Sequence, residues 1–86
     1  MRRATNQLPQ HREERNAVTE YLTALEEIYP AARGTAQVVE RPDQRVIVSI
    51  PLPTRVRERM RLFDRMAEVG TQLLLETNQY IILSGR

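Results

Sequence analysis

Two segments of this chain resemble each other, and this likeness constrains the fold more than any other feature. Gly34–Glu40 resembles Gly70–Glu76 at a spacing of 36 residues, and residues 44–49 resemble residues 79–84 at a spacing of 35. The one-residue difference falls in a predicted turn, where insertions are tolerated. Since each pair of segments follows an amphipathic stretch, the sequence predicts a helix–strand–strand unit used twice.

The first unit begins with a predicted helix after Asn16, whose side chain suits the N-cap position. Pro30 and Gly34 close this helix. Its apolar residues recur at helical spacing and predict a buried face; they are Val18, Tyr21, Leu22, Leu25, Ile28 and Tyr29. Two strands, Thr35–Arg41 and Arg45–Ile50, then form a predicted hairpin across a polar turn.

The second unit begins with a helix predicted from Thr54 to about Val69, with Gly70 at its C-terminal end. Its core-facing stripe is predicted to be Val56, Met60, Phe63 and Ala67, flanked by Leu62 and Met66. A second hairpin then pairs Gln72–Glu76 with Gln79–Ser84 across the turn Thr77-Asn78, where Asn tolerates a left-handed backbone.

These elements predict a two-layer α+β fold of order αββαββ, with two helices on one face of a four-stranded, mostly antiparallel sheet. This order is a cyclic shift of the ferredoxin-like βαββαβ order. The permuted arrangement places Arg45–Ile50 and Gln79–Ser84 at the centre of the sheet, which agrees with their apolar composition. The alternative is a four-stranded meander with the helices on one side.

The second face of such a sheet has no helix to cover it. Alternation along the strands places an apolar group on that face, made up of Val39, Ile47, Leu74, Tyr80 and Ile82. A monomer rarely exposes a contiguous apolar patch of more than a few hundred Å². The sequence therefore predicts a homodimer, or a complex with another protein partner, through these residues. The alternative is a scatter of surface apolar residues, which folded proteins carry routinely.

Charge divides the chain into two parts. Residues 1–15 carry four Arg and two Glu, whereas residues 16–86 hold equal numbers of basic and acidic side chains. We expect residues 1–15 to be a flexible basic arm and residues 16–86 to form a single domain. Arg57, Arg61 and Arg65 fall at helical spacing and suggest an alternative role in nucleic-acid binding, together with the arm.

The composition argues against several kinds of chemistry. The chain has no Cys, which excludes disulfides and thiolate ligands, and its one histidine, His11, cannot build a multi-His metal site alone. No catalytic residue set or cofactor motif is recognisable, and no apolar run approaches the ~20 residues needed to span a bilayer. We therefore expect a small, non-enzymatic, cytoplasmic interaction module without a metal or cofactor.

Overall fold

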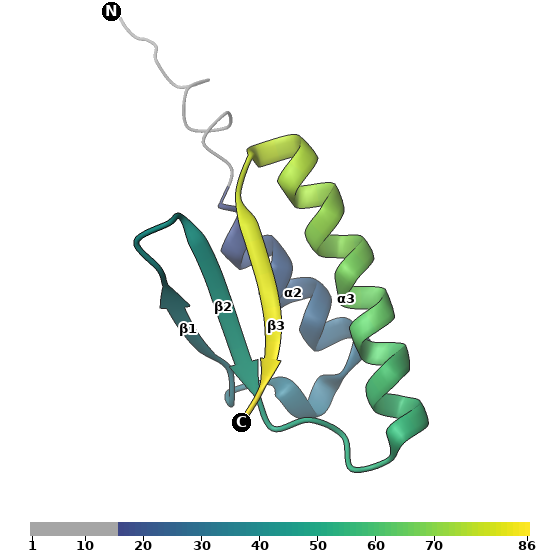
Figure 1. The fold of residues 1–86 in the computed structure, drawn as a ribbon. Coiled ribbons are helices and arrows are strands. Elements are labelled where there is room, and N and C mark those ends of the chain that lie inside the picture. The colour runs from purple at the N-terminus through teal and green to yellow at the C-terminus, as the bar shows by residue number, and fades with distance from the viewer. Residues whose placement is uncertain (1–15) are drawn as a thin grey trace, which may run out of the picture.

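The computed structural model describes residues 16–86, so the predicted arm of residues 1–15 lies outside the described residues. Within residues 16–86 the fold is α+β, with two long helices against a three-stranded mixed sheet (Figure 1). Helix α2 lies behind the sheet, and helix α3 runs beside strand β3 (Figure 1). The predicted α+β class is confirmed.

Helix α2 spans Ala17–Ile28 and begins as predicted. The Asn16 side chain accepts a hydrogen bond from the backbone N–H of Thr19 at 3.1 Å, which satisfies a donor that the first helical turn leaves free. Its residues Ala17, Tyr21 and Leu25 are buried, so one face of the helix enters the core. A short 3₁₀ helix, η1 (Pro30–Ala32), follows α2.

Strands β1 (Gln37–Glu40) and β2 (Arg45–Ile50) form the predicted antiparallel hairpin. Gln44 takes the left-handed conformation in the turn, with φ of 72°. Strand β2 alternates strictly, and its side chains Val46, Val48 and Ile50 are buried against the helices.

The second half of the chain departs from the prediction. Helix α3 spans Val56–Thr77 and passes through Gly70 without a break, so the predicted strand Gln72–Glu76 is helical. Leu73 follows Met66 by seven residues and lies on the same buried face, so burial favours continuing the helix over starting a strand. Residues 16–86 therefore show neither the predicted four-stranded sheet nor the duplicated unit.

Helix α3 ends at Asn78, which is left-handed with φ of 62° and donates its backbone N–H to the Leu74 carbonyl at 2.9 Å. The left-handed conformation predicted for Asn78 is thus confirmed, but the residue caps a helix and does not close a hairpin. Strand β3 (Tyr80–Gly85) then pairs with β2 in parallel, and the sheet order is β1-β2-β3. Strand β3 is an edge strand, so neither the permuted ferredoxin-like order nor the meander is observed.

One core joins the helices to the back of the sheet. It is formed by Ala17, Tyr21, Leu25, Ala32, Val46, Val48, Ile50, Leu62, Met66, Leu73, Ile81 and Leu83. Within residues 16–86, no helix is long and apolar enough to cross a membrane.

Candidate interaction surface

The face of the sheet that points away from α2 carries an apolar row. Val39 pairs with Ile47 in the antiparallel ladder, and Ile47 pairs with Ile82 in the parallel ladder. Because directly paired residues share a face, these three side chains line up across the whole sheet, opposite the buried side chains of β2. Val39 is 48% exposed, and Tyr80, one pleat along from Ile82, is 47% exposed.

Helix α3 carries two apolar stripes instead of the single one predicted. Leu62, Met66 and Leu73 form the buried stripe. The residues predicted to face the core are on a different side of the helix: Met60 is 61% exposed, Phe63 is 36% exposed, and Val56 is also exposed. The prediction for this stripe is wrong because both stripes have helical spacing, so periodicity alone does not distinguish the buried stripe from the exposed one.

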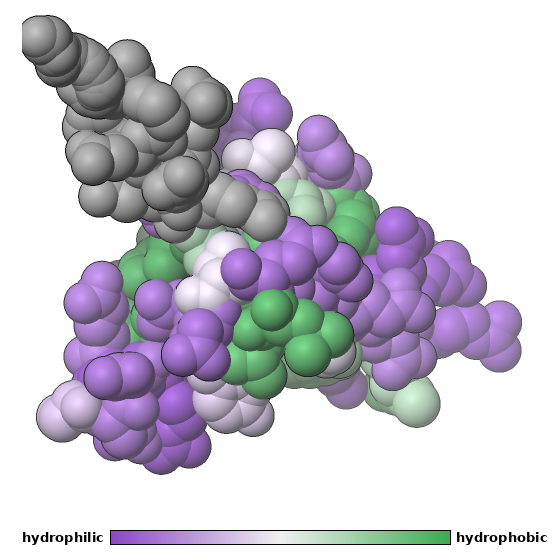
Figure 2. Space-filling view, turned by 90° about the horizontal axis from the view of Figure 1, so that it is seen from above, coloured by the Kyte–Doolittle hydropathy of each residue, from purple (hydrophilic) through white to green (hydrophobic). Residues whose placement is uncertain are grey.

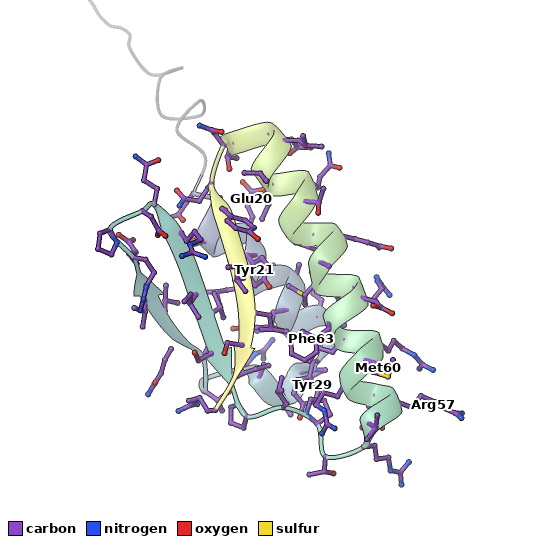
Figure 3. The ribbon with its side chains drawn as sticks, in the orientation of Figure 1. Glu20, Tyr21, Tyr29, Arg57, Met60 and Phe63 are labelled. Carbon is purple, nitrogen blue, oxygen red and sulfur yellow. The ribbon has the colours of Figure 1, made fainter. Side chains whose placement is uncertain are left out.

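A groove of about 250 Å³ lies between the exposed stripe of α3 and strand β3. Phe63, Ala67, Thr71 and Leu74 line it from the helix, and Tyr80 and Ile82 line it from the strand. Figure 3 shows Phe63 on the side of α3 nearer to β3, with Arg57 pointing away from the sheet. Seen from above, hydrophobic atoms reach the surface between hydrophilic flanks (Figure 2).

The five residues predicted to form an interface therefore occupy one continuous surface. Val39, Ile47, Tyr80 and Ile82 lie on the open sheet face as predicted, whereas Leu74 belongs to α3 and not to a strand. Leu74 nevertheless lines the same groove as Tyr80 and Ile82. We call this the front surface; it comprises Val39, Ile47, Phe63, Ala67, Thr71, Leu74, Tyr80 and Ile82. The helical half of the front surface is not predicted by the sequence, because the sequence pattern predicts a strand over residues 72–76.

The floor of the groove holds a buried phenol. Tyr21 is 1% exposed, and a Cβ atom added to Gly70 would stand 3.7 Å from its ring. Burial raises the pKa of Tyr21 well above its ordinary value. Among residues 16–86, no group forms a hydrogen bond with its hydroxyl, so within this part of the chain Tyr21 contributes through packing.

An ion pair marks the rim of the front surface at the hairpin turn. The Asp43 carboxylate accepts hydrogen bonds from the Arg45 side-chain Nε at 2.7 Å and from the Arg45 backbone N–H at 3.3 Å. The side-chain hydrogen bond from Arg45 lowers the pKa of Asp43. Arg45 pairs with Tyr80 in the β2–β3 register, so this end of the apolar face is polar and charged.

The predicted basic stripe lies apart from the front surface. Arg57, Arg61 and Arg65 are all exposed on α3, and none of the three forms an ion pair with another described residue. Glu58, Asp64 and Glu68 alternate with them along the helix, so the stripe is interrupted by acidic residues.

Within the part of the chain that the structure describes, no three His, Cys, Asp or Glu side chains cluster in a way that could hold a metal ion. Comparison with protein-family models, curated proteins and solved structures found no match to this chain.

Proposed function

We propose that this chain is a small, non-enzymatic interaction module that acts as a homodimer through its front surface. The observation that supports this proposal is the in-register row of Val39, Ile47 and Ile82, which runs across the whole sheet and opens into an apolar groove. Helix α2 lies behind the sheet and α3 runs beside β3, so neither of these helices lies over the row (Figure 1).

The size of the front surface is consistent with association. Three strands side by side and one helix are together about 25 Å wide, and six strand residues are about 20 Å long, which gives a projected area of about 500 Å². A rough side-chain surface has a larger accessible area, of the same order as the ~800 Å² per partner buried in a standard interface. Covering the row also offsets the marginal core of so short a chain.

The experiment is to place a charge in the middle of the row. We expect Ile82→Glu to convert a dimer into a monomer at micromolar concentration, as measured by sedimentation equilibrium or light scattering. The matched control is Leu75→Glu, because Leu75 is 77% exposed and does not line the groove. A parent protein that is monomeric throughout this range would refute the proposal.

Ile82 is half-buried, so its replacement also carries a risk to the fold. Circular dichroism and thermal unfolding of both variants separate the two effects. A second variant, Val39→Glu, tests the same row from the other edge of the sheet, where the side chain is more exposed. Retention of the dimer by a folded Val39→Glu and a folded Ile82→Glu would exclude this face as the interface.

The alternative function is nucleic-acid binding through Arg57, Arg61 and Arg65. It is favoured by the exposure of the three guanidinium groups and by the absence of an ion pair to any of them among residues 16–86. Binding of labelled DNA or RNA would then weaken steeply with salt, and replacing all three residues by Gln would lower the slope of log K against log salt by up to about 3. No binding by the full chain at low salt would rule this function out.

A further inference from the structure

We infer that the second copy docks face to face, with its α3 antiparallel to the first α3 about a two-fold axis that follows the row Val39–Ile47–Ile82 and reaches α3 at Ala67. This inference rests on the proposed homodimer and adds its geometry. The two sheets would face each other, the exposed stripes of the two α3 helices would meet, and each groove would lie opposite the partner's groove.

The position of the axis follows from one close contact between α3 and β3. The Ile81 carbonyl oxygen lies 3.2 Å from the point where a Cβ atom on Gly70 would stand, so these two residues are level. Helix α3 runs antiparallel to β3 (Figure 1). One residue along β3 advances about 3.3 Å, and three residues back along α3 about 4.5 Å. Ala67 is therefore nearly level with Ile82, at the end of the apolar row.

The exposed stripe of α3 is complementary to itself about this point. A two-fold axis through Ala67 places Phe63 opposite Thr71 of the partner helix, a large side chain against a small one. It places Met60 opposite Leu74 of the partner helix, at each end of the contact. The small side chain of Ala67 meets its own copy at the centre, where two helices need the closest approach. These residues recur at spacings of four and three, as in a coiled-coil seam.

Charge along α3 also favours a second copy in this orientation. From Val56 to Met66 the helix carries four Arg against Glu58 and Asp64, whereas from Glu68 to Thr77 it carries only Glu68 and Glu76 as charged residues. The N-terminal half is therefore net positive and the C-terminal half net negative. An antiparallel partner places the net positive half of each helix along the net negative half of the other and also opposes the two helix dipoles. A parallel partner would place like charges together.

Residues 1–15 are a poor alternative occupant of the front surface. Their apolar side chains are confined to Met1, Ala4 and Leu8, and they include a proline and six charged residues. Such a segment cannot fill an apolar face that extends from β1 to α3. A second copy offers a surface of matching size and composition.

Disulfide trapping tests this geometry directly, because the chain contains no cysteine. Met60→Cys and Leu74→Cys proteins are purified separately, mixed under reducing conditions and then oxidised. In the antiparallel dimer, Cys at one position faces Cys at the other, whereas like positions lie roughly 20 Å apart, beyond the reach of a disulfide. We expect the mixed disulfide to exceed each homodisulfide by about tenfold or more, as measured by mass spectrometry.

Two further cysteine variants serve as the positive and negative controls of the disulfide experiment. Ala67→Cys is expected to form a homodisulfide efficiently, and Glu58→Cys, on the opposite side of the helix, is expected to form none above the background of random collision. Preferred homodisulfides at positions 60 and 74 would indicate a parallel arrangement and overturn the inference. A dimer that yields no disulfide at positions 60, 67 and 74 would overturn it as well and leave the proposed homodimer standing. A monomeric parent protein would overturn both.

Discussion

The carbonyl oxygen of Ile81 lies 3.2 Å from the position that a Cβ atom on Gly70 would occupy. Ile81 belongs to the edge strand β3, and the backbone of α3 closes on that edge at this point. Gly70 is therefore not a helix terminus but a site where the helix approaches strand backbone. A helix that covers the edge of a sheet also protects it from pairing with other chains.

The effect of enlarging Gly70 on the free energy of unfolding is expected to depend on the size of the new side chain. Alanine gains about 1 kcal/mol of helix propensity, which offsets the small displacement of Ile81 that its Cβ requires, so we expect a net change within about 1 kcal/mol. Gly70→Val is expected to lower the free energy of unfolding by about 3 kcal/mol, because its branched side chain meets strand backbone and the Tyr21 ring.

Urea denaturation of the parent, Gly70→Ala and Gly70→Val measures the differences in the free energy of unfolding. Arg65→Val serves as the control, because Arg65 is exposed on α3 and reports only the helix propensity of a β-branched residue. Equal stability of Gly70→Val and the parent would show that α3 does not pack this closely.

The two stripes of α3 are expected to respond differently to truncation. Met66→Ala should lower the free energy of unfolding by about 2–5 kcal/mol, because Met66 is 1% exposed and its removal leaves a cavity. Met60→Ala, measured in dilute monomer, should change it by no more than about 0.5 kcal/mol. Thermal or chemical unfolding of the two variants is the measurement, and similar losses from both would place Met60 in the core.

Tyr21 is expected to make the protein sensitive to alkali. Its pKa is raised by burial, so the folded chain holds the phenolic proton more tightly than the unfolded chain does. The stability that this proton confers is complete below the unfolded pKa of about 10 and is lost above it by up to about 1.4 kcal/mol per pH unit. At neutral pH the group has no effect on the pH dependence.

Comparison with Tyr21→Phe isolates this effect. The parent should lose stability more steeply than the variant above pH ~10, as measured by denaturant unfolding at several pH values. At pH 7 the variant should be at least as stable as the parent, because the Tyr21 hydroxyl that it lacks has no hydrogen-bond partner among residues 16–86 of the parent. Identical pH profiles for both proteins would contradict a buried phenol at this site.

Removing the cap of α2 is expected to cost about 1 kcal/mol. The Asn16 side chain is the acceptor for the Thr19 backbone N–H, and Asn16→Ala leaves that donor to water. Asn16→Ser should recover most of the loss, since a hydroxyl oxygen can accept the same bond. Unchanged unfolding of Asn16→Ala would show that α2 depends on its buried face alone.

The elements fixed by local signals were predictable. The Asn16 cap, the helix after it and the hairpin of β1 and β2 follow from cap chemistry, periodicity and turn residues close in sequence. The buried faces of β2 and β3 follow from strict alternation.

The second half could not be predicted, because local and tertiary preferences disagree there. Gly70 and the apolar run Leu73–Leu75 resemble a helix end and a strand, yet Leu73 completes the buried stripe of Met66 and extends the helix. Because residues 72–76 are helical, β3 has no antiparallel hairpin partner. It pairs instead with β2, in parallel. The open sheet face was foreseen because alternation does not depend on which strands are neighbours.

The parallel pairing of β2 with β3 has a kinetic consequence. Each paired residue of this ladder joins positions 35 apart in the chain, from Arg45 with Tyr80 to Ile50 with Gly85. Closing so long a loop costs entropy before any of its contacts is gained, so α3 must largely form and fold back before the ladder can assemble. The β1–β2 hairpin is therefore expected to form early but to be unstable alone, and the sheet to be completed late in folding when β3 adds to it.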